Sequence, residues 1–165
     1  MHIEHGLQRK RSAFSYRLSL VREKGEPLRS HRLRLPIDAV QACRHFLPTD
    51  LDREIFGVLL VNTRNTVIGF NTVSIGTVNG SIVHPRETFK AAILGNASAI
   101  VCFHNHPSGD PYPSNEDRLL TARLKKAGDT IGIQLLDHVV LADAGHYESE
   151  ISGQTYYSFK EHGEV

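Results

Sequence analysis

One continuous apolar segment, Ile55–Val61, constrains the fold of this chain more than any other feature. A strand with one face in water alternates apolar and polar residues, whereas a run without polar residues is typical of a strand buried on both faces. The turn-forming residues 62–65 follow it, and a second apolar stretch, Val67–Ile75, resumes after them. We therefore predict a strand, a turn and a second strand, the first of them covered on both sides.

Further strands and helices alternate along the rest of the chain. We predict additional strands over 81–83, 99–103, 133–141 and 156–159, the last at a sheet edge, and helices over 36–47, Pro85–Leu94 and 114–126. Pro48, Gly95 and the pair Gly128 and Gly132 are expected to end these helices, and Phe89, Ala92 and Ile93 to form the inner face of the second. This order predicts an α/β fold, a mixed β-sheet sandwiched by helices.

Charge is unevenly distributed along the 165 residues, although the net charge is only +1. Residues 1–35 hold nine Lys and Arg side chains against three Glu, so this segment is +6 and the remainder is −5. We predict a basic, flexible N-terminal arm over 1–35 and one folded domain over 36–165. The arm permits weak contact with nucleic acid. A solvated tail explains the same residues, because the arm has few aromatic rings on which bases could stack.

Two compositional features bear on the compartment of the protein. No apolar run approaches the roughly 20 residues of a membrane span, and the first residues form no signal peptide, so a soluble, cytoplasmic protein without membrane contact is expected. Cys43 and Cys102 lie far apart and form no CxxC motif. We therefore expect neither a disulfide framework nor a thiolate zinc site, and both cysteines should be buried as small apolar residues.

The segment from His104 to Asp117 carries the candidate chemistry. His104 and His106 are two residues apart, so in an extended chain both imidazoles point to the same side and can approach one ion. Catalytic zinc needs three protein ligands and one open position, and Asp117 can supply the third ligand from the first turn of the following helix. Prolines in the intervening loop lower the entropy lost when that helix returns to the strand end.

Each of these residues also has a structural interpretation. Histidine pairs are common without a metal, and Ser114 with Asp117 forms a capping box that needs none. Asp110 is expected in a turn, and Asn105 faces away from the histidine pair. Two further histidines stay open: His138 can hydrogen-bond a metal ligand or fill the core, and the role of His84 is equally undecided.

A family resemblance favours the metal interpretation. His104-x-His106, seven residues and then Ser114-x-x-Asp117 resemble the JAMM (MPN-plus) metalloprotease motif. Flanking text at 84–87, 106–110 and 136–138 resembles the RadC-like branch of that superfamily, and the likeness covers about residues 36–162. The resemblance implies a cytidine-deaminase-like JAB/MPN fold and one Zn²⁺ per chain on His104, His106 and Asp117.

The resemblance also implies catalytic roles. Glu54 precedes a hydrophobic strand with a glycine three residues on, which matches the glutamate that acts as general base in the family, and Ser114 would steady the oxyanion. Glu87 is the rival to Glu54, but its place in the first turn of a helix explains it without catalysis. A solvent-facing glutamate at the start of a strand is the structural alternative for Glu54.

Three functions are compatible with this resemblance. The first is a zinc-dependent metallohydrolase, a metallopeptidase or isopeptidase that cleaves an amide bond in an unidentified protein or peptide. The second is a RadC-like protein associated with DNA repair or mobile elements, whose metal site is not its main activity. Longer RadC-like proteins carry an N-terminal helix-hairpin-helix region, and we expect this chain to be a short form without it. The third, a scaffold without metal, is disfavoured because every motif position is intact.

Overall fold

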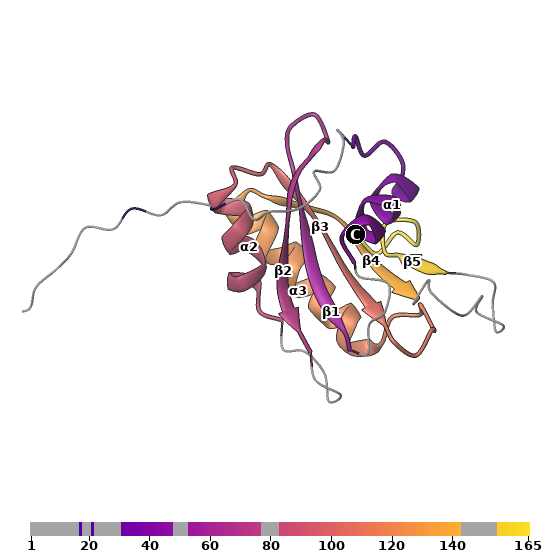
Figure 1. Ribbon diagram of the computed structural model, residues 1–165. Helices are drawn as coiled ribbons and strands as arrows, with labels where there is room; N and C mark the ends of the chain where they lie inside the picture. Colours follow the sequence, from indigo (N-terminus) through magenta and orange to yellow (C-terminus); the bar gives the residue numbers. More distant parts are fainter. Residues whose placement is uncertain (1–16, 18–20, 22–30, 48–52, 77–82, 143–154) are drawn as a thin grey trace, which may run out of the picture.

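The computed structural model describes residues 17, 21, 31–47, 53–76, 83–142 and 155–165. These residues form one five-stranded sheet with helices packed on it (Figure 1). The strand order is β2-β1-β3-β4-β5; β3 and β4 are parallel, and the other neighbours are antiparallel. In chain order the elements are α1 (Pro36–Phe46), β1 (Ile55–Val61), β2 (Val67–Ile75), α2 (Pro85–Leu94), β3 (Ala99–His106), α3 (Asn115–Ile131), β4 (Gln134–Ala142) and β5 (Tyr156–Ser158).

Helices cover both faces of the sheet, as the apolar run predicts. Every residue of β1 is buried. Phe56, Val58 and Leu60 pack in a core cluster with residues of α2 and α3, whereas Leu59 and Val61 pack in a second cluster with residues of α1. The prediction of a mixed sheet sandwiched by helices is therefore confirmed, and so is the burial of both cysteines.

The predicted end of α3 is wrong, because this helix continues through Gly128 to Ile131. A Cβ atom at Gly128 would lie 2.5 Å from the main-chain oxygen of Ile133, so glycine is needed here for a close approach of the chain. Gly132 is the residue that ends the helix, with a φ of 83° and an N–H donated to the oxygen of Gly128.

The inner face of α2 also differs from the prediction. Phe89 and Ala92 are buried, but Ile93 is 54% exposed. Thr88 and Ala91 are buried instead, which centres the buried face away from Ile93 on the helical wheel. Among the strands, β3 extends past the predicted 99–103 to His106, and β5 ends at Ser158 within the predicted 156–159.

Parts of the N-terminal arm and two predicted segments lie outside the described residues. These are most of 1–30, the expected helix stop at Pro48 and most of the strand predicted over 81–83. Contacts with the folded body begin slightly ahead of residue 36: the N–H of Leu33 donates to the oxygen of Asn65 at 2.7 Å, and the N–H of Val67 donates to the oxygen of His31 at 2.9 Å. In the described part of the chain, no helix is both long and apolar enough to cross a membrane.

The close packing at Gly57 provides a test of the fold. A Cβ atom here would lie 2.4 Å from the ring of Phe103, the cross-strand neighbour on β3. We expect Gly57→Ala to lower the free energy of unfolding by about 1–3 kcal/mol, the usual cost of overpacking a core. Urea unfolding of the purified variant measures this difference.

Gly69→Ala on β2 is the matched control. The nearest side-chain atom to its Cβ would be Leu60 Cδ1 at 3.5 Å, an ordinary contact, so the same substitution should leave stability near that of the parent protein. Equal stability of the two variants would contradict the packing described for Gly57.

Candidate metal centre

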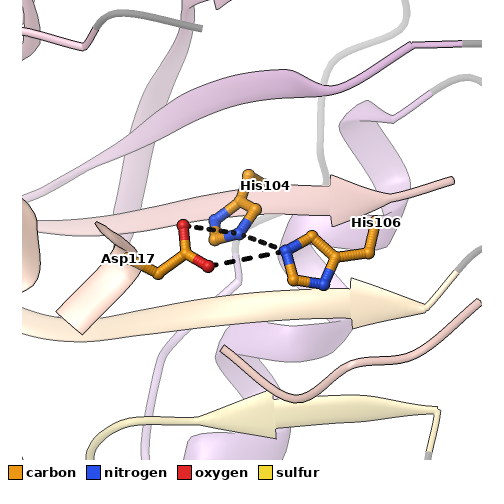
Figure 2. A group of neighbouring side chains, drawn as sticks. All are labelled: His104, His106 and Asp117. Carbon is orange, nitrogen blue, oxygen red and sulfur yellow. Dashed lines mark hydrogen bonds and ion pairs between the residues drawn. The ribbon is translucent and has the colours of Figure 1, made fainter. Parts of the chain in front are cut away.

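Two histidines and one carboxylate meet at the carboxyl end of β3 (Figure 2). His104 Nε2 lies 3.0 Å from His106 Nε2. Asp117, in the first turn of α3, places Oδ1 3.4 Å from His104 Nε2 and Oδ2 3.6 Å from His106 Nε2. The structure thus brings together the three metal ligands that the sequence predicts, and one potential ligand atom of each lies within 4.8 Å of the others.

Local structure explains the convergence. Because β3 runs to His106, both histidines lie on one extended segment, and their spacing of two sets them on the same side of the sheet. Ser114 caps α3: its hydroxyl accepts from the N–H of Asp117, and Asp117 Oδ2 accepts from the N–H of Ser114 at 2.8 Å. The capping box and the cluster therefore coexist, because the Asp117 carboxylate serves both.

The donor set fits a tetrahedral metal ion. With bonds of about 2.0–2.2 Å to nitrogen and oxygen, the ligand atoms of tetrahedral zinc lie about 3.3–3.6 Å apart, close to the spacings found here. The His104 side chain is fully buried, whereas those of His106 and Asp117 are 18% and 13% exposed. One side of the cluster thus remains open to an additional ligand.

The electrostatics of the cluster favour a negative carboxylate beside the imidazoles. Burial raises the pKa of Asp117, but the close approach of the His104 and His106 imidazoles outweighs burial and holds this pKa well below its usual range. Burial lowers the pKa of His106, but the bonds to Asp117 and to the Asp110 carbonyl outweigh it, and the net pKa is raised. His106 Nδ1 donates to that carbonyl at 2.7 Å, which leaves Nε2 directed at the cluster.

His138 lies directly behind the cluster. Its Nε2 is 2.9 Å from His104 Nδ1, and its Nδ1 is 2.7 Å from the hydroxyl of Thr121 on α3. The Phe159 ring stacks on the His138 ring with 5.0 Å between their centroids, and His138 is fully buried. Burial, followed by the charge of His104, lowers the pKa of His138 well below its usual value. His138 thus has the contact with a candidate ligand that was one of its two predicted roles.

Glu54 directly precedes β1, the strand that pairs with β3. The β1–β3 register pairs Phe56 with His104, and its extension by two residues sets Glu54 opposite His106 on the same face. Asn105 holds this segment: its Oδ1 accepts from the N–H of Ile55 at 2.8 Å, and its Nδ2 donates to the oxygen of Arg53 at 3.1 Å. Asn105 faces away from the histidines, as predicted, and fixes the main chain on both sides of Glu54.

The remaining predicted residues have structural partners. His84 Nδ1 caps α2 by accepting from the N–H of Arg86, and Glu87 pairs with Arg86 and Lys90 in the first turn of that helix. Sequence reasoning missed two contributors, Thr121 and the carbonyl of Asp110. Thr121 carries a detectable signal, since it lies four residues after Asp117 on the same helix face. A main-chain carbonyl carries none.

Fold and site together define an α/β domain with a potential metal site of two histidines and a carboxylate beside its central strand. The family model that matches the chain is the RadC-like JAB domain, over residues 33–164. The chain therefore belongs to the RadC-like JAB domain family.

Several curated proteins are similar in sequence to this chain. A UPF0758 protein of Thermotoga maritima is 48% identical over 115 residues, which are 70% of this chain and 47% of that protein. UPF0758 proteins of Rubrobacter xylanophilus and Listeria monocytogenes are 46% and 45% identical over 147 residues, 89% of this chain and 58% and 59% of theirs. The chain spans about half the length of the curated relatives it matches.

The role of Asn105 is testable without an assay of activity. Asn105→Ala removes the acceptor of the buried Ile55 N–H, and an unsatisfied buried donor costs about 1–3 kcal/mol. We expect faster hydrogen exchange at the amide of Ile55 and lower stability. Exchange measured by NMR, residue by residue, checks this.

Asn62→Ala is the control for this variant. Asn62 Oδ1 also accepts from two main-chain N–H groups, those of Arg64 and Thr66, but at the opposite end of β1. Its loss should leave the Ile55 amide protected. Unchanged protection of Ile55 in Asn105→Ala would show that Asn105 does not hold the Glu54 segment.

Proposed function

We propose that this protein is a zinc-dependent metallohydrolase that adds water across an amide bond of a peptide or isopeptide. The observation that carries the proposal is the convergence of His104 Nε2, His106 Nε2 and the Asp117 carboxylate at spacings suited to one tetrahedral ion. Membership of the RadC-like JAB family supports it. His104, His106 and Asp117 are the proposed ligands, with one Zn²⁺ per chain.

The partial exposure of the cluster supports catalysis rather than a purely structural metal. A structural zinc site is closed by four protein ligands, whereas a catalytic site has three and an open position. When bound in such a site, zinc supplies a Lewis acid that polarises a carbonyl and makes water more acidic. His106 and Asp117 form the exposed side of the cluster, from which a substrate carbonyl would approach.

Glu54 is the proposed general base. It is half-buried, and extension of the β1–β3 register places it opposite His106. Its negative charge is among the influences that raise the pKa of His106. In the proposed reaction its carboxylate takes a proton from the attacking water and then gives it to the nitrogen that leaves, so the hydroxyl group ends on the carbonyl carbon and the proton on the amine. Asn105 holds the main chain from which this carboxylate projects.

Ser114 is the proposed donor to the oxyanion. Its hydroxyl donates to Asp117 Oδ2 at 2.6 Å, so this proton is engaged before any substrate arrives. Donation to an oxyanion therefore requires the hydroxyl to rotate away from Asp117, which the exposed position of Ser114 permits sterically. The N–H of Ser114 would continue to hold the Asp117 carboxylate during that rotation.

Metal analysis tests the ligand assignment. Protein purified without a polyhistidine tag should carry about one zinc per chain, and His104→Ala/His106→Ala should lose it. Asp117→Asn should lower zinc affinity under a competing chelator, because a neutral oxygen is a poorer ligand for a dication. Asp129→Asn, an exposed position near the other end of α3, should bind zinc like the parent protein. Equal occupancy in Asp117→Asn would count against ligation by Asp117.

A substitution at Glu54 tests catalysis separately from binding. Glu54→Gln should retain zinc and lose hydrolysis by about 100-fold or more, because the amide keeps the size but not the basicity of the carboxylate. Mixtures of linear and lysine-branched peptides, analysed by mass spectrometry, provide the substrates. Glu87→Gln should behave like the parent protein.

The outcomes distinguish the alternatives. Loss of zinc in Glu54→Gln would make Glu54 a ligand, and loss of activity only in Glu87→Gln would make Glu87 the base. Stoichiometric zinc with no cleavage of any peptide would favour a RadC-like role in which hydrolysis is not the main activity.

A further inference from the structure

We propose that Thr121 and His138 are positioning residues that keep a proton on Nδ1 of His104 and so reserve His104 Nε2 for the metal. This inference rests on the proposed metal site and extends it to two residues behind the ligands. It follows from the direction of three consecutive hydrogen bonds. They link the main chain of Asp117 to Thr121, Thr121 to His138, and His138 to His104.

The first bond sets the direction of the others. The Thr121 hydroxyl lies 2.6 Å from the main-chain oxygen of Asp117. A carbonyl can only accept, and two oxygens this close without a proton between them would repel each other, so the single hydroxyl proton points at Asp117. The Thr121 oxygen is then left with lone pairs only toward its other partner, His138 Nδ1.

The second and third bonds follow from the chemistry of imidazole. His138 Nδ1, 2.7 Å from an oxygen that can only accept, must carry a proton. The ring is fully buried, and burial favours the neutral form with one N–H, so His138 Nε2 presents a lone pair. His104 Nδ1, 2.9 Å away, must therefore donate to it. The only nitrogen of His104 left to bind a metal is Nε2, which faces His106 and Asp117.

The opposite direction would disable the site. If Thr121 donated to His138 Nδ1, His138 would carry its proton on Nε2 and donate to His104 Nδ1. His104 would then hold its proton on Nε2, the nitrogen that points into the cluster, where a proton blocks coordination. The bond from the Thr121 hydroxyl to the Asp117 carbonyl selects the first arrangement of protons, because it uses the only proton of that hydroxyl. His106 Nδ1 donates directly to the carbonyl of Asp110, so Nε2 is also the nitrogen of His106 that faces the cluster.

Nitrogen NMR of the metal-free parent protein tests the proposal directly. Long-range correlations between ring protons and ring nitrogens report which imidazole nitrogen carries the proton. At mildly alkaline pH, we expect His104 protonated at Nδ1 and His138 protonated at Nδ1. A bare Nδ1 on His104 would overturn the proposal, and this measurement requires neither zinc nor a variant.

Variants of Thr121 give an independent readout. Thr121→Val keeps the shape but removes the hydroxyl, so we expect zinc affinity in a chelator competition to fall about 10–100-fold, the usual effect of losing a partner of a ligating histidine. Thr121→Ser restores the hydroxyl and should restore the affinity. Thr130→Val is the matched control on the same helix, because the Thr130 hydroxyl makes the same bond to a carbonyl four residues back, that of Lys126, but is exposed. Parent-like affinity in Thr121→Val would contradict the proposal.

These outcomes are separable from failure of the proposed function. A parent protein that binds no zinc, yet shows His104 protonated at Nδ1, would refute the metallohydrolase and leave the hydrogen-bond direction intact. Zinc-dependent hydrolysis that needs Glu54, with zinc affinity unaffected by Thr121→Val, would leave the function intact and refute the role of Thr121.

Discussion

Burial of β1 and β3 on both faces is the constraint on which the rest of the structure depends. Because helices cover these strands above and below, polar groups can reach solvent only where the strands end. His104 still lies inside that boundary and is fully buried, so both of its nitrogens need partners. The cluster supplies them on one side and His138 on the other. The polar layer behind the cluster is thus a consequence of placing an imidazole within a packed core.

Asp117 connects this polar layer to the stability of α3. Its carboxylate accepts from the N–H and hydroxyl of Ser114 and faces both histidines, while its main-chain oxygen accepts from Thr121. The first turn of the helix is therefore fixed by the same atoms that form the candidate site. Loosening of this turn would move Asp117, a proposed ligand. The helix cap therefore keeps the Asp117 carboxylate at its distance from the two histidines.

The sequence predicts the elements well where a single local signal defines them. The limits of β1, β2 and α2 follow from apolar runs bounded by turn residues, proline and glycine. The end of α3 does not, because the need for glycine at 128 arises from Ile133, which approaches only after the chain has turned back. The three candidate ligands lie within fourteen residues and show a motif. The contacts that hold these residues in place join different elements: Asn105 bonds the main chain beside Glu54, and Thr121 bonds His138. The sequence alone does not show these contacts, because they depend on the register of the folded sheet.

Unequal burial of the three candidate ligands has a kinetic consequence. An ion that enters the proposed site meets the partly exposed His106 and Asp117 before the enclosed His104, and it must leave in the reverse order. Among the described ligand side chains, those of His106 and Asp117 are the ones a chelator could reach, and His106 is hydrogen-bonded to the carbonyl of Asp110. The lifetime of a bound ion would then depend on how often the turn at Asp110 opens, and the rate of ion exchange would be set by that opening rather than by the equilibrium affinity.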